Sequence, residues 1–143
     1  MTELRFVSPA DDPALEDWRL IHNVVVPPWP LSLPEVTERA GRNLLEVAYL
    51  DRVAVGNSTV RPPGDDGVAT VIARVLPAHR GRGFGTLIHS RALAAARELG
   101  PAEIETLVLA ANVDGLRFAE QQGYVEVERY EVHGAQEVRL RLR

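Results

Sequence analysis

Glycine and arginine alternate over residues 80–86, where the sequence is RGRGFGT. Glycines at alternate positions let backbone N–H groups approach an anion closely, and arginine guanidinium groups donate paired hydrogen bonds to phosphate oxygens. A strand is predicted before this loop and a helix after it, so the loop opens a helix whose dipole contributes about half a positive charge. The pattern predicts a binding site for the phosphate groups of a ligand.

Two other kinds of phosphate-binding loop fit this sequence poorly. A P-loop has a lysine after its last glycine, and the chain contains no lysine. A dinucleotide-binding fingerprint has the spacing GxGxxG, whereas the spacing here is GxGxG, with Thr86 in the place of the third glycine. Residues 80–97 contain four arginines and no carboxylate, although the net charge of the chain is −4. This distribution favours a small anionic ligand, so we expect no nucleic-acid partner.

The composition limits the class of protein further. The chain has no cysteine, which excludes disulfides, thiolate metal sites and a cysteine nucleophile, and its histidines lack metal-ligand spacing, so we expect no metal. The start, MTELRFVSPADD, lacks the basic and apolar segments of a secretory signal, and no apolar stretch approaches the length of a bilayer span. We therefore expect a cytoplasmic protein without a membrane partner, folded as a single domain over residues 1–143.

The elements that position the loop follow from apolar periodicity and turn residues. Strands are predicted at 4–8, 44–50, 53–60, 68–76, 105–110, 124–132 and 136–142, and helices at 11–25, 32–41, 83–99 and 115–122, with Asp114 as the cap of the last helix. The strands at 68–76 and 105–110 have too few polar residues to face water, and a helix connects them. They predict one right-handed parallel crossover in an α+β domain whose sheet of about seven strands is mostly antiparallel.

The run VLPAHRGRGFGT at 75–86 resembles the signature [RQ]xxGx[GA] of the GNAT superfamily of acyl-CoA-dependent N-acyltransferases, through Arg80, Gly83 and Gly85. The predicted order of elements is similar to that family along essentially the whole chain. The resemblance implies a GNAT-like α/β/α domain with a mixed, twisted sheet and four helices. It also implies acetyl-CoA as cosubstrate and a primary amine of a small molecule or peptide as acceptor.

The resemblance assigns residues to the cofactor. Asn112, Phe118 and Gly123 fall where the family's second cofactor-contacting motif would place them. By resemblance, the backbone near Val75 would pair with the pantetheine arm and the glycine loop would hold the pyrophosphate. The cofactor-binding residues that the resemblance implies are Val75, Leu76, Pro77, Arg80, Gly81, Arg82, Gly83, Phe84, Gly85, Thr86, Asn112 and Phe118.

The family mechanism that the resemblance implies is direct attack of the amine on the thioester in a ternary complex, with the oxyanion held by a main-chain N–H near Val75 or Leu76. Donors of this kind contribute about 3 to 4 kcal/mol. Many members have a tyrosine that protonates the departing thiolate where this chain has Ala119, and we expect Tyr124 to lie in the core or at a strand start. The alternative function is therefore an acyl-CoA-binding regulatory or scaffold module without catalysis.

The general base and the acceptor pocket are less visible, because strand 68–76 carries no carboxylate. Glu46, Tyr49 and Glu105 are the candidate bases, with His79 beside the loop, and the alternative for each is an ordinary exposed strand or loop residue. The segment PPWP at 27–30 is either part of the acceptor pocket or a hydrophobic anchor. The sequence leaves open the acceptor's identity, a homodimer and membership of a tandem two-domain protein.

Overall fold

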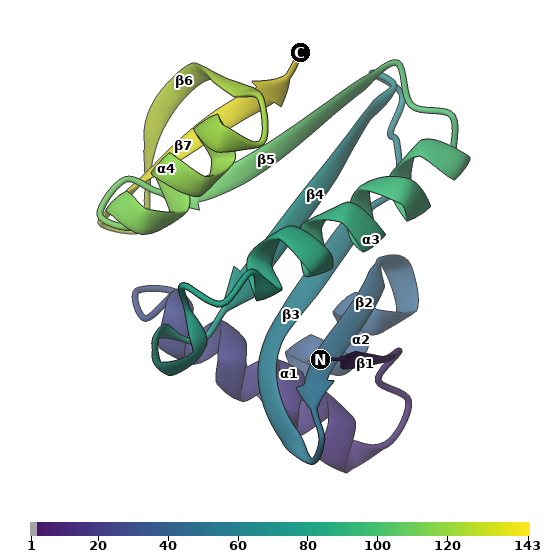
Figure 1. Cartoon of the computed structure of the whole chain (residues 1–143). Helices are drawn as coiled ribbons and strands as arrows, with labels where there is room; N and C mark the ends of the chain where they lie inside the picture. The colour runs from purple at the N-terminus through teal and green to yellow at the C-terminus, as the bar shows by residue number, and fades with distance from the viewer. Residues whose placement is uncertain (1–2) are drawn as a thin grey trace.

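The computed structural model describes residues 3–143 and contains a seven-stranded sheet with helices against both faces (Figure 1). The elements are β1 (Leu4–Val7), α1 (Asp12–Val25), α2 (Leu33–Arg42), β2 (Leu44–Leu50), β3 (Val53–Arg61), β4 (Val68–Val75), a 3₁₀ turn (Pro77–His79), α3 (Phe84–Glu98), β5 (Glu103–Leu109), α4 (Val113–Gln121), β6 (Tyr124–Val132) and β7 (Ala135–Leu142). The predicted α+β class, with seven strands and four helices, is confirmed.

The sheet has the strand order β1-β2-β3-β4-β5-β7-β6, and within residues 3–143 only the β4–β5 pair is parallel. That ladder joins just three residue pairs, from Val68 with Glu103 to Thr70 with Glu105. Both strands continue beyond it, β4 to Val75 and β5 to Leu109, without pairing to each other. They diverge into a V (Figure 1), so backbone groups on the facing edges of the two strands are left to a ligand or to water.

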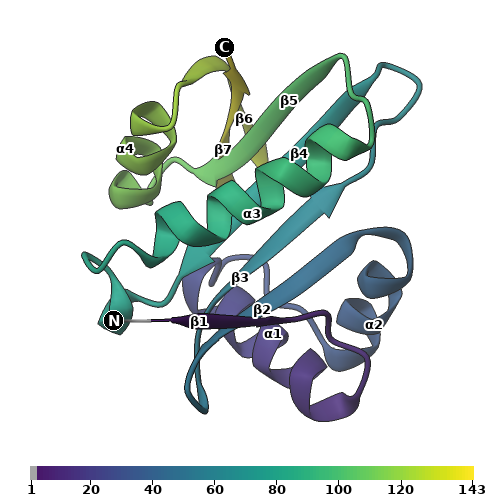
Figure 2. The same ribbon diagram turned by 45° about the vertical axis from the view of Figure 1, so that its right-hand side comes forward.

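Two apolar layers fix the helices on the sheet. On one face α1 and α2 pack through Trp18, Ile21 and Val36, and on the other α3 packs through Ile88 and Ala92. Figure 2 shows α3 crossing the sheet on the side opposite α1. No helix within residues 3–143 is long and apolar enough to cross a membrane.

Helix caps follow the sequence signals, with one correction. Ser32 and Glu35 form the predicted capping box of α2. The last helix, however, is capped by Asn112, whose Oδ1 accepts from the Gly115 backbone N–H at 3.0 Å, and the prediction of Asp114 as its cap is wrong. The Asn112 N–H donates to the Leu109 carbonyl at 2.9 Å, so the turn after β5 places Asn112, and not Asp114, at the start of the helix.

Candidate active site

The glycine loop adopts a conformation that leaves the start of α3 open. Gly81 and Gly83 have φ of 79° and 83°, in the left-handed region that favours glycine. Gly83 is the N-cap residue of α3, and it makes no side-chain cap hydrogen bond. The first-turn N–H groups of α3 are therefore available to an anion at the positive end of the helix dipole.

Arginines and the start of α4 surround this helix end. Arg80 donates from Nε to the Val75 carbonyl at 3.0 Å, and its Nη1 lies 3.6 Å from a carboxylate oxygen of Asp114. Gly85 allows α3 to approach α4 closely, since a Cβ there would lie 3.3 Å from the Phe118 ring. The guanidinium of Arg82 lies over the Phe84 ring, 4.8 Å from its centroid.

A cleft of about 500 Å³ lies between the glycine loop, the end of β4 and the start of α4. Most of the predicted cofactor residues line it together: Val75, Arg80, Gly81, Gly83, Phe84, Gly85, Thr86, Asn112 and Phe118. Leu76, Pro77 and Arg82 are not among its lining residues. Arg117 and Arg74 also line the cleft and were not predicted there; helical spacing from Asp114 was the available signal for Arg117.

Hydrogen bonding at the end of β4 determines which backbone groups face this cleft. The Leu76 N–H donates to the Val55 carbonyl at 2.9 Å, so Leu76 points its backbone toward β3. Antiparallel pairs alternate between bonded and non-bonded, so the neighbouring Val75–Gly56 pair is non-bonded and the Val75 N–H points away from β3, toward the V. The N–H groups of Val75 and Leu76 are the two candidate oxyanion donors predicted from the sequence. Of these two, the Val75 N–H is the one that has no partner in β3 and is free to bind an oxyanion.

A smaller inner pocket of about 60 Å³ continues the cleft between β4 and β5. Ala119 and Tyr124 line it, and the Tyr124 hydroxyl lies 2.9 Å from His89 Nε2. Burial raises the pKa of Tyr124 to about 12 and lowers the pKa of His89. Tyr124 starts β6 and is buried, as predicted, and it also places a protonated hydroxyl beside Ala119.

The end of α1 and the loop after it form one wall of the inner pocket, through Val25, Val26 and Trp29. His22 Nε2 lies 3.0 Å from the Trp29 carbonyl oxygen, which can only accept, so Nε2 carries the proton and Nδ1 accepts from Arg74 Nη1 at 3.4 Å. Burial and the charge of Arg74 lower the pKa of His22 to about 4. The Trp29 indole donates to the Val132 carbonyl at 3.1 Å and also lines the inner pocket, so the PPWP segment is an anchor and a pocket wall at once.

The candidate bases on β2 lie away from the cleft. Glu46 faces α3, where both carboxylate oxygens accept from Arg91 at 2.7 and 3.0 Å. Tyr49 faces α1 and donates its hydroxyl proton to Asp17 at 2.6 Å, and burial with this hydrogen bond raises its pKa to about 12. Neither residue lines the cleft or the inner pocket.

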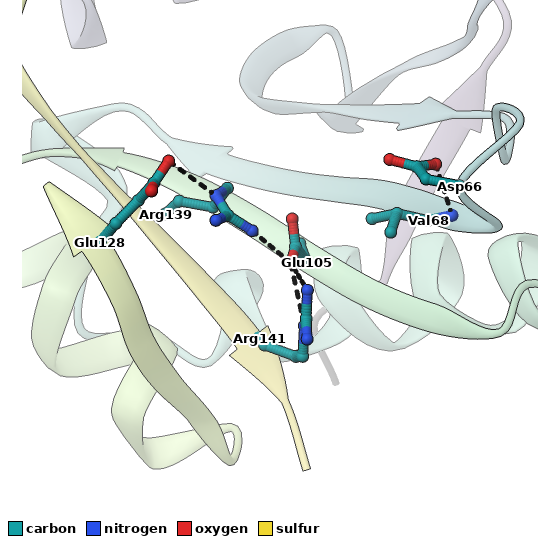
Figure 3. Close-up of polar contacts among 6 residues, drawn as sticks. All are labelled: Asp66, Val68, Glu105, Glu128, Arg139 and Arg141. Carbon is teal, nitrogen blue, oxygen red and sulfur yellow. Dashed lines mark hydrogen bonds and ion pairs between the residues drawn. The ribbon is translucent and has the colours of Figure 1, made fainter. Parts of the chain in front are cut away.

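Glu105 is held by arginines of β7 (Figure 3). Its Oε2 accepts from Arg139 at 2.7 Å and from Arg141 at 2.6 and 2.9 Å, and Arg139 also contacts Glu128 at 3.3 Å. Glu105 is only 5% exposed and is absent from the lining of both cavities. The role of Glu105 as general base stays a prediction, and this geometry does not favour it.

Two other groups with base chemistry do line the cavities. His79 lines the cleft, and its buried Nδ1 has no hydrogen-bond partner within the described part of the chain. Glu137 of β7 lines the inner pocket, and one of its carboxylate oxygens accepts from the Tyr130 hydroxyl at 2.8 Å. Sequence reasoning missed Glu137, because its position depends on the pairing of Leu109 with Glu137 across β5 and β7. Among residues 3–143 no group of three acidic or histidine side chains could hold a metal ion.

Comparisons with known proteins agree with this architecture. The sequence model of the family described as "Acetyltransferase (GNAT) family" matches residues 9–124. Ard1 from Thermoplasma volcanium has a similar structure, with a TM-score of 0.80 at 15% identity over 99% of this chain and 97% of that one. The ribosomal-protein-S18-alanine N-acetyltransferase from Escherichia coli has a TM-score of 0.76 at 16% identity over 98% and 93%.

A third similar structure is yncA from Salmonella typhimurium with its cofactor acetyl-CoA, with a TM-score of 0.73 at 18% identity over 97% of this chain and 92% of that one. At these identities the structures show a shared fold. No curated protein sequence matches the chain significantly.

Proposed function

Because the chain belongs to the GNAT family of acetyltransferases, which use acetyl-CoA, we propose that it transfers an acetyl group to a primary amine of a small molecule or peptide. The observation that carries this proposal is the V between β4 and β5, where the unpaired Val75 N–H faces a cleft that ends at the glycine loop. One cavity thus joins an anion site to a free main-chain donor. A substrate with a phosphate group at one end and a reactive carbonyl at the other fits this arrangement.

The glycine loop fits the pyrophosphate of acetyl-CoA. Gly83 leaves the first-turn N–H groups of α3 open, and Arg80 and Arg117 line the same cleft. When bound, acetyl-CoA supplies a thioester carbonyl that an amine can attack. Val75 lines the cleft, where its N–H would stabilise the developing oxyanion by about 3 to 4 kcal/mol.

Glu137 is our proposed general base. Its carboxylate is held by Tyr130 and lines the inner pocket, whereas the carboxylates of Glu46 and Glu105 are each held by arginine. An amine with a pKa of about 10.4 is neutral roughly once in 2,500 molecules at pH 7, and an α-amine near 7.7 about one time in six. A carboxylate at this place would remove the proton directly or through one water.

We propose Tyr124 as the proton donor to the departing thiolate. It lines the inner pocket beside Ala119, and its raised pKa keeps the hydroxyl protonated across the physiological range. His89 Nε2 lies 2.9 Å from this hydroxyl and holds it in place. Tyr124→Phe is expected to lower kcat about tenfold or more while leaving the KM for acetyl-CoA unchanged. An unchanged kcat would remove Tyr124 from the mechanism.

Thermal shift measures the cofactor part of the proposal separately from catalysis. Acetyl-CoA at about 100 times its Kd should stabilise the protein by about 2.7 kcal/mol, which is roughly 8 °C in Tm for a chain of this size. Gly83→Glu should abolish the shift, because it strains a left-handed position and places a negative charge in the anion site. Gly41→Glu is the matched control, since a Cβ at Gly41 meets nothing within 4 Å and its φ is not left-handed.

Thiol release with a panel of primary amines then tests transfer itself. Turnover that Gly83→Glu abolishes and Gly41→Glu preserves supports an acetyltransferase that uses this cleft. Tight acetyl-CoA binding without thiol release from any amine would instead favour the alternative, a binding module without catalysis. Equal shifts for the two glycine variants would refute the cofactor site.

A further inference from the structure

Two arginine side chains lie on the sheet face that α1 and α2 cover, and a third lies near them on α2. In the β3–β4 ladder Asn57 pairs with Arg74 and Arg61 with Thr70, and alternation places Arg61 and Arg74 on the same face. The Asn57 amide donates to the Trp18 carbonyl of α1 at 3.1 Å, which identifies that face. Arg39 of α2 is close enough for its charge to act on both Arg61 and Arg74. We call these three residues the arginine cluster.

The arginine cluster lacks carboxylate partners. Within residues 3–143 none of its three guanidinium groups lies within 4.0 Å of a carboxylate, although all three side chains are half-buried. Arg139 and Arg141 on the same sheet, by contrast, bind Glu105 at 2.7 and 2.6 Å. Unpaired positive charges gathered in this way repel one another, so a bound anion that supplied the counter-charge would be favourable.

The electrostatics agree with this geometry. Burial, and then the positive charges of Arg61 and Arg39, lower the pKa of Arg74 to about 10. Glu137 attracts Arg61 and Arg74, and Glu35 and Glu38 attract Arg39. Each of these carboxylates already has another partner: Glu137 accepts from Tyr130, Glu35 from the Ser32 N–H and Glu38 from Arg42. The cluster therefore keeps an excess of positive charge that a bound anion would neutralise.

The position of the cluster separates it from the cofactor's phosphate site. Arg74 lines the inner pocket and the cleft, so one end of the cluster reaches the expected reaction centre. Arg61 of β3 pairs with Thr70, which lies four residues before Arg74 on β4, so Arg61 and Arg74 are about 13 Å apart along the strands. Arg39 and Arg61 are absent from the lining of the cleft, where the glycine loop serves the cofactor. An anion held by them would belong to the other substrate.

We propose that the arginine cluster binds an anionic group of the acceptor, a carboxylate or a phosphorus oxyanion, so that the preferred acceptors are small amines carrying negative charge. The planar guanidinium fork matches either group with paired hydrogen bonds. This inference rests on the proposed function, because it assigns the acceptor of the same reaction.

Matched ligand pairs test the charge preference without requiring turnover. We would measure calorimetric binding of L-leucine and L-leucinamide, and of 3-aminopropylphosphonate and propylamine, to protein saturated with CoA. The acid of each pair is expected to bind at least tenfold more tightly than its neutral or cationic partner. The stronger pair identifies the carboxylate or the phosphonate as the better anion. Equal binding within both pairs, or no binding by either acid, overturns the proposal.

Variants then locate the site. Arg61→Gln and Arg39→Gln are each expected to weaken binding of the anionic amine roughly 10- to 100-fold, with no change in the thermal shift by acetyl-CoA. Arg129→Gln is the matched control, because Arg129 is an exposed arginine of β6 that is paired with Glu126. A reduced acetyl-CoA shift in the cluster variants would assign the cluster to the cofactor instead. Charge-selective binding without thiol release would support the cluster and count against transfer.

Discussion

The buried, neutral His22 should make the fold less stable as the pH falls from 7 to 5, because the unfolded chain takes up a proton on this residue that the folded ring does not. The neutral ring links two elements, with Nε2 donating to the Trp29 carbonyl and Nδ1 accepting from Arg74. A second proton would turn Nδ1 into a donor facing a guanidinium. The folded ring therefore resists a second proton, because that proton would face Arg74 at the inner end of the arginine cluster.

The magnitude follows from the pKa of His22. The folded value of about 4 lies below the unfolded value near 6.5, so the unfolded state binds more protons between these values and stability falls as the pH falls. The contribution is almost complete at pH 7, and by pH 5 about 2 kcal/mol of it is lost. His22 is only 4% exposed, so solvent does little to screen this effect.

Urea denaturation at both pH values, for the parent protein and for His22→Gln, isolates this contribution from other titrating groups. The glutamine amide can also donate to Trp29 and accept from Arg74, but it does not titrate. The parent should lose about 2 kcal/mol more than the variant between pH 7 and pH 5. Equal losses in the two proteins would refute the assignment of a neutral, buried His22.

Three further substitutions test other contacts. Glu105→Gln should lower the free energy of unfolding by about 2 kcal/mol, because three charge-assisted hydrogen bonds from Arg139 and Arg141 weaken, while kcat stays unchanged; a large loss of kcat would restore Glu105 as a base. Asn112→Ala should cost about 1 kcal/mol in urea denaturation and Asp114→Ala less, since Asn112 is the cap; the reverse order contradicts this. Gly56→Ala should cost about 3 kcal/mol or more by the same measurement, because its Cβ would lie 2.4 Å from the Arg74 carbonyl oxygen, and a near-neutral effect would contradict this packing.

Local signals in the sequence were enough to predict most of the fold. The capping box of α2, the crossover helix and the glycine loop each depend on neighbouring residues, so the pattern and the structure agree. The cap of α4 differs because both Asn112 and Asp114 are good capping residues, and the turn after β5 decides between them.

The acceptor side depends on contacts between distant segments, which explains why it was less predictable. Alternation along β2 puts Glu46 and Tyr49 on opposite faces, but the sequence does not say which helix covers each face. Glu137 reaches the inner pocket only through the β5–β7 register, and a bulge between Glu126 and Glu128 shifts the neighbouring ladder. The arginine cluster likewise contains residues from α2, β3 and β4, so no short sequence motif predicts it.

The short β4–β5 ladder makes the V an internal edge within the sheet. Beyond Thr70 and Glu105, β4 and β5 do not pair with each other through their backbones. An extended ligand arm lying between them would take the place of a missing strand. Amide hydrogen exchange at Val75 should therefore slow when the cofactor binds, while exchange at Leu76, already bonded to Val55, should change little. The free energy of unfolding would then depend on the concentration of acyl-CoA, and depletion of acyl-CoA would make the chain more susceptible to proteolysis.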